Sequence, residues 1–391
     1  MIEKLRKCAQ ENEQRILELR HQIHQYPELA FEEVRTAKVI CEELDRLGIE
    51  IHANYADTTA VVGVIQGVTD GPTRALRADI DALPVQEETG LPFASKIPGK
   101  MHACGHDAHT AILLGTAHLL TRFRSQLAGR IVLVFQPGEE GHAGARVLVE
   151  YGLLEEFGIE AMFGHHVWAN LPPGHFATRP GVMTSNSDNF SAEIKGRGAH
   201  AARPNMGIDP VVVASHFVLA CQDIISREVS PNSPAVITFG KLRAGEAYNV
   251  IPERAIFEGT VRTQSAEVQN FVQERMQQVL QGITSAFRTT GTLTYRRLYP
   301  SVINHQGLTR DVMTLAEDFW GTSQVATIPH ASMVGEDFAF YTKKVASCFG
   351  FLGIGSPYDH HNPRFVVDES TLAPAAAWTS YIALKSAEFM P

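Results

Sequence analysis

The chain has 391 residues, of which 44% are hydrophobic and 20% are charged, and its formal net charge is −9. This composition is typical of a folded globular protein and excludes the disordered and fibrous classes. No apolar run approaches the roughly 18 residues that span a bilayer, and no sustained block of Lys or Arg favours nucleic acid as a partner. The first residues lack the apolar segment of a signal peptide, and the five cysteines are scattered, so we expect a reducing cytoplasm.

The N-terminal third predicts helices that alternate with strands. Apolar residues at helical spacing indicate one helix that ends before Pro27 and a second that ends at Gly48. Further along, strands are predicted at 59–65, 73–78, 130–136 and 159–167, and helices at 107–123 and 143–151. The continuous apolar run at 130–136 is typical of a strand buried on both faces. The alternation therefore predicts a mostly parallel sheet covered by helices on both sides.

The pattern changes at about residue 188. The order that follows is strand, helix, strand, strand, helix, strand, which is the ferredoxin-like split unit. These elements are predicted at 189–195, 210–229, 235–242, 254–262, 265–289 and 292–298. The α/β pattern then resumes with a helix at 308–319, a strand at 347–354 and a helix at 372–389. We therefore expect an α/β domain built from residues 1–185 and 299–391, with an inserted ferredoxin-like α+β domain at 186–298.

Polar side chains with the chemistry of metal ligands follow the predicted strands or begin a predicted helix. They are Asp79, Asp81, Cys104, His106, Asp107, Glu139, Glu140, His165 and His166. Ligands of open α/β sheets bind beyond the carboxyl ends of the strands, so these loops are expected to converge on one place. A thiolate, imidazoles and carboxylates together suit Zn²⁺ or a similar divalent ion.

Each of these features also has an ordinary structural explanation. Cys104 alone would be a small buried apolar residue. The Glu139–Glu140 pair could lie in a solvated turn, and Asp79 and Asp81 could cap a helix. The combination favours a catalytic site. One glutamate of the pair can ligate, while the other takes a proton from a metal-polarised water and passes it to a leaving nitrogen. The spacing of Cys104 and His106 does not match a structural zinc finger.

Nine segments then identify a family. In chain order they are HQYPELAFEE, LRADIDALP, MHACGHDAHTA, FQPGEEG, GRGAHAARP, YNVIPERA, GTVRT, MVGEDFAFY and HNPRF. With them the chain resembles, over nearly its whole length, the M20 family of metallopeptidases and amidohydrolases. It looks most similar to the branch of N-acyl-amino-acid hydrolases that includes hippurate hydrolases and indoleacetyl-amino-acid hydrolases.

The resemblance implies a catalytic domain that holds two divalent metal ions per subunit, and a smaller lid or dimerisation domain. A homodimer or higher homo-oligomer is therefore expected. Zinc is the default metal, and Mn²⁺, Co²⁺ or Ni²⁺ would also suit the ligands. The implied ligands are Cys104, His106, Glu140, His166 and His361. His165 stands where the family usually has Leu, which leaves open which histidine of that pair ligates, and His360 is a less favoured alternative to His361.

The resemblance also implies roles for residues other than the ligands. Glu139 is the implied general base, and Asp81 is expected just behind the ligands, with Asp79 nearby. In the inserted domain, His200 is expected to reach a bound substrate across a dimer interface and stabilise the oxyanion. Asn249 and Arg262 are the expected contacts to a substrate carboxylate, a task that suits the forked donors of arginine.

The function expected from these residues is hydrolysis of the amide bond of an N-acyl amino acid, of the acetyl, benzoyl or indoleacetyl type, by metal-activated water. The products would be a carboxylic acid and a free amino acid. A dipeptidase or carboxypeptidase of the same family is the nearest alternative, because both reactions share one mechanism. A metal-binding dimer without catalysis is less favoured, because it would have no use for a base at Glu139.

Overall fold

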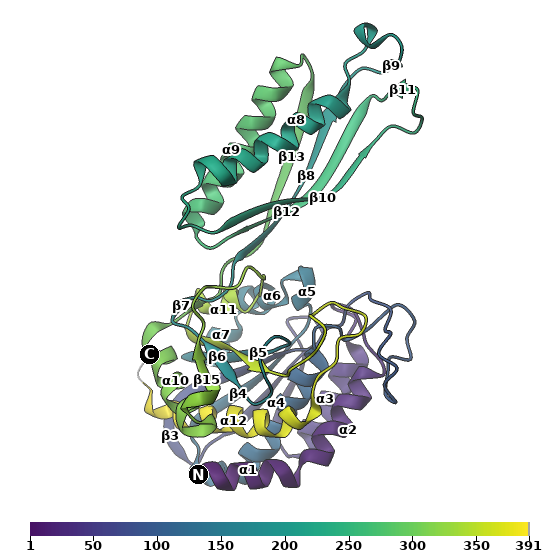
Figure 1. The fold of residues 1–391 in the computed structure, drawn as a ribbon. Coiled ribbons are helices and arrows are strands. Elements are labelled where there is room, and N and C mark those ends of the chain that lie inside the picture. The colour runs from purple at the N-terminus through teal and green to yellow at the C-terminus, as the bar shows by residue number, and fades with distance from the viewer. Residues whose placement is uncertain (390–391) are drawn as a thin grey trace. The chain divides into compact units, whose positions relative to one another are not determined.

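A computed structural model describes residues 1–389 and divides into two compact units (Figure 1). The first unit consists of Met1–Met183, Ile303–His330 and the segment that begins at Asp337. The second unit consists of Thr184–Val302 together with the short segment Ala331–Glu336, which the sequence pattern did not indicate. Among the helices of residues 1–389, none combines the length and the apolar character needed to cross a membrane.

The first unit is built on an eight-stranded sheet with the order β1-β2-β4-β3-β5-β16-β6-β15. Its strands are β1 (Glu50–Tyr55), β2 (Ala60–Gln66), β3 (Thr69–Asp79), β4 (Ala128–Gln136), β5 (Ala161–Trp168), β6 (Phe176–Thr178), β15 (Val325–Thr327) and β16 (Ala346–Gly353). The central strands β4, β3, β5 and β16 are parallel. Strands β1 and β2 on one side, and β6 on the other, join in antiparallel fashion. The α/β fold class is thus confirmed, with antiparallel additions at the edges.

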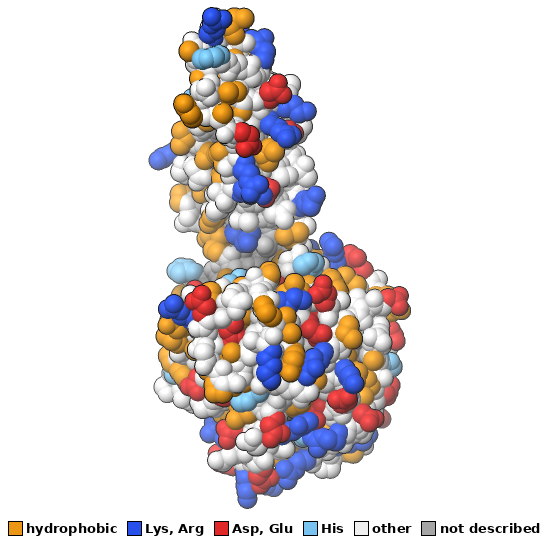
Figure 2. Space-filling model, turned by 90° about the vertical axis from the view of Figure 1, so that its right-hand side faces the viewer, with side chains coloured by type: hydrophobic (Ala, Val, Ile, Leu, Met, Phe, Trp, Pro, Cys, Tyr) orange, Lys and Arg blue, Asp and Glu red, His pale blue; other side chains and the backbone are white. Residues whose placement is uncertain are grey.

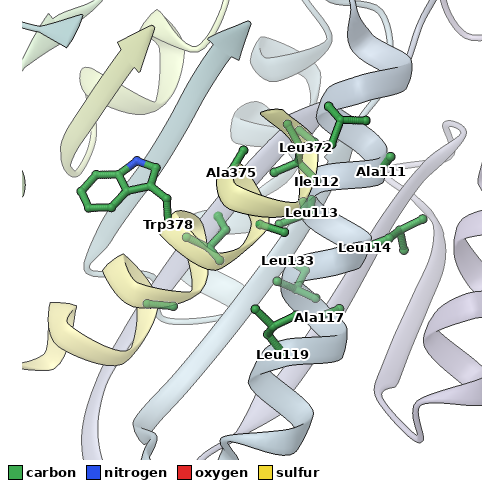
Figure 3. Packing of buried hydrophobic residues seen from close by; sticks show 14 of the residues in the cluster. Ala111, Ile112, Leu113, Leu114, Ala117, Leu119, Leu133, Leu372, Ala375 and Trp378 are labelled. Atoms are coloured by element: carbon green, nitrogen blue, oxygen red, sulfur yellow. The ribbon is translucent and has the colours of Figure 1, made fainter. Parts of the chain in front are cut away.

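The sheet is buried on both faces at its centre. On β4, Ile131 and Leu133 belong to the main hydrophobic core, while Val132 and Val134 point the other way and are equally inaccessible. Figure 3 shows the main core where the helix that carries Leu372, Ala375 and Trp378 lies beside the helix that begins at His106. Because successive residues of a strand face opposite sides, burial of both sets requires cover on both faces, which agrees with the predicted buried strand.

The helices of the first unit are mostly those that apolar spacing predicts. They are α1 (Ile2–Glu11), α2 (Glu13–His24), α3 (Val34–Arg46), α4 (His106–Arg122), α5 (Glu139–His142), α6 (Gly144–Tyr151), α7 (Leu153–Glu156), α10 (Gln306–Trp320), α11 (Ala339–Thr342) and α12 (Leu372–Lys385). The last predicted helix was too long, because α12 ends at Lys385 and a 3₁₀ turn at Ser386–Glu388 follows it. On the face shown in Figure 2, basic and acidic side chains are interspersed over this unit.

The second unit has the predicted order of strands and helices. Its elements are β8 (Asn186–Lys195), α8 (Pro210–Asp223), β10 (Ala235–Ala244), β12 (Arg254–Thr263), α9 (Ala266–Ala286) and β13 (Thr290–Tyr299), and the sheet order is β10-β12-β8-β13. All three pairings in this sheet are antiparallel, which confirms the ferredoxin-like arrangement. The predicted helix at 210–229 is formed by α8 and a π-helical turn at Ile224–Glu228 that follows it without a break.

Two further two-stranded pairs complete the fold. In the second unit, β9 (Ala199–His200) pairs with β11 (Val250–Ile251). In the first unit, β7 (Gly181–Val182) pairs with β14 (Ile303–Asn304), where the chain leaves and re-enters the unit.

Candidate metal centre

The carboxyl ends of β4 and β5, the start of α4 and the loop after β16 bring six polar side chains of the first unit together. Their ligand-type atoms lie within 4.8 Å of one another in three overlapping groups. The groups are Cys104 with His106 and His166, Cys104 with Glu140 and His361, and His106 with Glu139 and Glu140. Cys104 belongs to two of the groups. All six residues come from the set that the sequence singled out.

The turn that carries Cys104 and His106 requires a glycine between them. Gly105 has a φ of +85°, a left-handed conformation that most side chains disfavour. A Cβ atom at this position would also lie 2.5 Å from Cγ2 of Val167, near the end of β5. The close approach brings the Cys104 Sγ atom to 3.3 Å from Nε2 of His166. Gly105 therefore allows the start of α4 and the end of β5 to share one site.

The hydrogen bonds of His106 and His166 leave one ring nitrogen of each directed to the cluster. Nδ1 of His106 donates to the carbonyl oxygen of Asp81 at 2.9 Å, and its Nε2 is buried without a hydrogen-bond partner. Nδ1 of His166 donates to the carbonyl oxygen of Val167 at 2.6 Å. Since a carbonyl only accepts, Nδ1 carries a proton in both rings, and Nε2 is the nitrogen that the neutral ring can offer to a metal. This is the tautomer in which histidine ligates a metal.

The electrostatics of the cluster suit a bound cation. Burial, and then the charges of Glu140, Glu139 and Asp79, raise the pKa of the Cys104 thiol well above its usual range. Burial acts to lower the pKa of His106, but Asp79, Asp81 and Glu140 outweigh it and raise that pKa to about 10. A divalent ion would supply the positive charge that these acidic side chains lack, and would allow the thiol to lose its proton. The residues present therefore fit a divalent metal.

Asp81 links His106 to the glutamate pair. Its buried carboxylate accepts hydrogen bonds from the backbone N–H of Glu139 at 3.1 Å and of Glu140 at 3.0 Å. Its carbonyl oxygen accepts from His106, as described above. One residue thus fixes both the imidazole and the turn on which Glu139 and Glu140 stand.

The two histidines of the HH pair at 360–361 have different environments. His361 has a φ of +65°, its N–H donates to the carbonyl oxygen of Ala103 at 2.8 Å, and its Nε2 lies 3.1 Å from a carboxylate oxygen of Glu140. His360 instead places Nε2 2.9 Å from the carbonyl oxygen of Val167. Only His361 of this pair joins one of the three ligand groups described above.

The two histidines on β5, His165 and His166, also have different environments. Successive side chains of a strand point to opposite faces, and His166 faces Cys104. His165 lines a cavity of about 20 Å³ together with apolar side chains such as Leu113, Phe163 and Trp378. Burial lowers the pKa of His165 to about 3, so its ring is neutral.

Sequence reasoning missed the ion pairs that support the site from behind. Arg77 donates to Asp79 at 2.6 Å and to Asp337 at 2.8 Å, and all three side chains are buried. Asp337 also accepts from the side chain of Gln136 at 2.9 Å. Asp337 lies in MVGEDFAFY, one of the segments that carry the family resemblance, but that segment gave no role for it. The network anchors the ends of β3 and β4.

His109 was also left without a role. Its Nδ1 is hydrogen-bonded to Asp79, and its Nε2 accepts from the N–H of Val167 at 2.9 Å. Asp79, His106 and His109 lie close enough to form a further group of ligand-type atoms. Because both nitrogens of His109 are already engaged, we interpret this residue as a link between β3 and β5 and not as a metal ligand.

The three remaining predicted residues lie in the second unit and do not form one cluster. His200 and Asn249 are exposed neighbours at the pairing of β9 with β11, where the Asn249 carbonyl accepts from the N–H of Ala201 at 3.1 Å. Arg262 is half-buried near the end of β12 and donates to the carbonyl oxygen of Asp188 at 3.3 Å. Since β12 begins at Arg254, close to β11, Arg262 lies about 26 Å further along the strand at the usual rise per residue.

Comparisons with known proteins identify the family of the chain. The sequence model of peptidase family M20/M25/M40 matches residues 75–385. The chain is 41% identical to an N-acetyl-L-cysteine deacetylase of Bacillus subtilis, over 96% of this chain and 88% of that one. It is 40% identical to IAA-amino acid hydrolase ILR1-like 5 of Arabidopsis thaliana, over 94% of this chain and 85% of that one.

A solved structure agrees with the sequence matches. The crystal structure of the Bacillus subtilis YXEP protein, described as a dinuclear metal binding peptidase from the M20 family, superimposes with a TM-score of 0.84. It is 36% identical in sequence, and the match covers 97% of this chain and all of that one. The resemblance found in the nine sequence segments is thereby confirmed. The chain belongs to peptidase family M20/M25/M40 and is a hydrolase of amide bonds.

Proposed function

We propose that the protein hydrolyses the amide bond of N-acyl amino acids at a centre of two divalent metal ions. The observation that carries this proposal is the position of Cys104, which two groups of ligand-type atoms share. One group would hold one ion through His106 and His166, and the other would hold a second ion through Glu140 and His361. The relative described as dinuclear supports two ions. Zinc suits these ligands, as would manganese, cobalt or nickel.

The reaction assigns separate tasks to the two neighbouring glutamates. Divalent ions, when bound, lower the pKa of a water ligand to about 7 and polarise a carbonyl group. Glu139 would take a proton from the attacking water and deliver it to the leaving nitrogen as the amide bond breaks. Asp81 would keep Glu139 in place, because it accepts the hydrogen bond of the Glu139 backbone N–H. The products are a carboxylic acid and a free amino acid.

The substrate carboxylate and the oxyanion would be bound by the second unit. His200 would stabilise the negative charge that develops on the carbonyl oxygen, and Asn249 and Arg262 would bind the carboxylate. His200 and Asn249 are neighbours, whereas Arg262 lies near the far end of β12, about 26 Å along the strand from Arg254. One small substrate would not reach both ends of one unit, so we propose a homodimer in which one subunit supplies His200 and Asn249 and the other supplies Arg262.

The acyl group is expected to be small or aromatic. One relative is named for deacetylation of N-acetylcysteine and another for hydrolysis of indoleacetyl amino acids, both of which are amides of an amino acid nitrogen. Peptide hydrolysis is a second candidate, because the superimposed Bacillus protein is described as a peptidase. Dipeptides and N-acyl amino acids both contain an amide bond to the nitrogen of an amino acid. They differ in the group attached to the carbonyl carbon of that bond.

The test is amino-acid release from a panel of acetyl, benzoyl and indoleacetyl amino acids and dipeptides, by metal-loaded and metal-stripped protein. Glu139→Gln should retain bound metal and lose at least about a hundredfold in kcat, the usual loss when a general base is removed. Glu150→Gln, at an exposed position on α6, is the matched control and should behave as wild type. Metal-independent release, or full activity of Glu139→Gln, would refute the proposal. Faster cleavage of the dipeptides would favour the second candidate.

A further inference from the structure

Three consecutive backbone N–H groups in the turn after β4 donate to buried carboxylates. The N–H of Gly138 donates to Oε1 of Glu33 at 3.1 Å. The next two N–H groups, of Glu139 and Glu140, donate to Asp81. Glu33 and Asp81 are 0% and 1% exposed. The turn that presents the proposed base and a proposed ligand is therefore held by two acidic side chains from other parts of the first unit.

Glu33 is itself firmly held. The hydroxyl of Thr59, just before β2, donates to Oε2 of Glu33. Phe31, two residues earlier, has a φ of +63°, which is rare for a residue other than glycine. Its ring packs on Gly138 so closely that a Cβ atom there would lie 3.0 Å from Cζ of Phe31. A backbone in this conformation persists only where its surroundings impose it. The segment 31–33 thus contacts the turn through both a ring and a hydrogen bond.

The carboxyl group of Glu33 interacts electrostatically with that of Asp81. Burial and the charge of Asp81 raise the pKa of Glu33 to about 7, against the lowering effect of the Thr59 hydrogen bond. A carboxyl group buried beside another acid costs folding free energy unless its hydrogen bonds are satisfied. Here the bonds to Gly138 and Thr59 satisfy it.

We propose that Glu33 is a positioning residue for the turn at Gly138. By fixing the Gly138 N–H, it sets where the side chains of Glu139 and Glu140 stand relative to Cys104 and His106. Glu33 belongs to none of the four groups of ligand-type atoms that contain Cys104 or His106, so its effect passes through the backbone of the turn. This inference rests on the proposed function for the roles of Glu139 and Glu140.

The test compares three variants of the full chain. Glu33→Ala removes the acceptor and should lower kcat and metal affinity by about 10- to 100-fold, as removal of a residue that orients metal ligands usually does. KM should stay within about threefold, because Glu33 has no place in substrate binding. Glu33→Gln keeps an oxygen for the Gly138 N–H and should recover most of both losses. Glu28→Ala is the control, because the Glu28 carboxylate comes from the same segment but accepts from the N–H of Arg35 and Thr36, at the start of α3.

Equal losses in Glu33→Ala and Glu28→Ala, or a Glu33→Gln variant as poor as Glu33→Ala, would overturn the inference. Metal affinity is measured by chelator competition and needs no substrate, so it tests the role of Glu33 even if no N-acyl amino acid is cleaved. Should Glu33→Ala fail to fold, Thr59→Val removes only the hydroxyl that orients the Glu33 carboxylate. That variant should lose about three- to tenfold in metal affinity, and an unchanged affinity would count against Glu33.

Discussion

Gly105 and Val167 approach each other so closely that a methyl group at position 105 would lie 2.5 Å from Cγ2 of Val167. Through this contact the turn with Cys104 and His106 meets the end of the strand with His166. Gly105→Ala adds both a clash and a side chain at a φ of +85°, so it must push α4 away from β5. We expect a loss of about 2–4 kcal/mol in the free energy of unfolding, together with weaker metal binding.

Gly141→Ala is the matched control for that variant. Its φ is +79°, but nothing lies within 4 Å of the position that a Cβ atom would take. It should therefore lose only the conformational part, about 1 kcal/mol. Urea unfolding of both variants, together with metal content after dialysis, measures the difference. Equal destabilisation would mean that the contact with Val167 relaxes without cost.

Because two groups of ligand-type atoms share Cys104, the number of bound metal ions should depend on which ligand is removed. Cys104→Ala removes a ligand from both groups and should leave the protein with almost no tightly bound metal. His361→Ala damages only the group with Glu140, so about one ion per subunit should remain if each group holds one. Elemental analysis of gel-filtered protein gives these ratios. An equal ratio in the two variants would show that Cys104 does not serve two ions.

Thermal unfolding adds a second measurement of the same sites. A metal that binds only the folded state stabilises it, by about 2.7 kcal/mol for each site when the free metal is at 100 times its Kd. Chelation should therefore lower the Tm of the wild-type chain and should barely change that of Cys104→Ala.

A feature of this protein could be predicted from sequence when residues close to it in the chain determine it. The strand at 130–136 was predictable because its continuous apolar run is itself the signature of burial on both faces. The segments of the candidate site were recognisable because their unusual residues lie at the ends of strands. The choice between His165 and His166 was not local, because strand alternation separates the two faces without showing which one carries the site.

Polar pairs between residues far apart in the chain could not be predicted for the same reason. Arg77 and Asp337 form a buried ion pair across 260 residues of sequence. Neither residue lies in a pattern that indicates its partner. The bond between Glu33 and the Gly138 turn likewise depends on how α3 and the strand ends pack. Such contacts follow from the tertiary fold, whereas hydrophobic periodicity reports only on the element that contains it.

His165 predicts a stabilising substitution. Its neutral ring lines a small cavity with apolar side chains, and leucine has a similar volume without polar atoms to desolvate. His165→Leu should raise the free energy of unfolding by about 1 kcal/mol and leave kcat unchanged. His109→Leu is the contrasting variant, because it breaks the links to both Asp79 and Val167. That change should lower stability by several kcal/mol. Denaturant unfolding separates the two, and a loss of activity in His165→Leu would be unexpected.

The buried carboxylate of Glu43, on α3, should make the stability of the fold sensitive to acid. The Glu43 side chain is 1% exposed and accepts from Arg15 at 2.6 Å and from Arg46 at 2.7 Å. Burial acts to raise the pKa of Glu43, but hydrogen bonds with His118, Arg46 and Arg15 outweigh it and hold that pKa well below its usual range. The folded state therefore binds fewer protons here than the unfolded state. Glu43 should contribute its full stabilisation above about pH 5 and lose it as the pH falls further.

Glu43→Gln should accordingly cost about 2–3 kcal/mol at pH 7, where an ionised acceptor for two arginines is lost. The difference from wild type should shrink as the pH falls below about 5, because Glu43 takes up a proton more readily in the unfolded chain than in the folded chain, and this stabilises the unfolded state of wild type. Glu42→Gln, one residue away, is the control. Its side chain is 63% exposed and lies 3.7 Å from the ammonium group of Lys38, so its loss should change stability by less than about 0.5 kcal/mol at every pH. Urea unfolding of the three proteins across this range measures the effect. A Glu43→Gln deficit that stays constant with pH would contradict the depressed pKa, because the deficit would then come from packing alone.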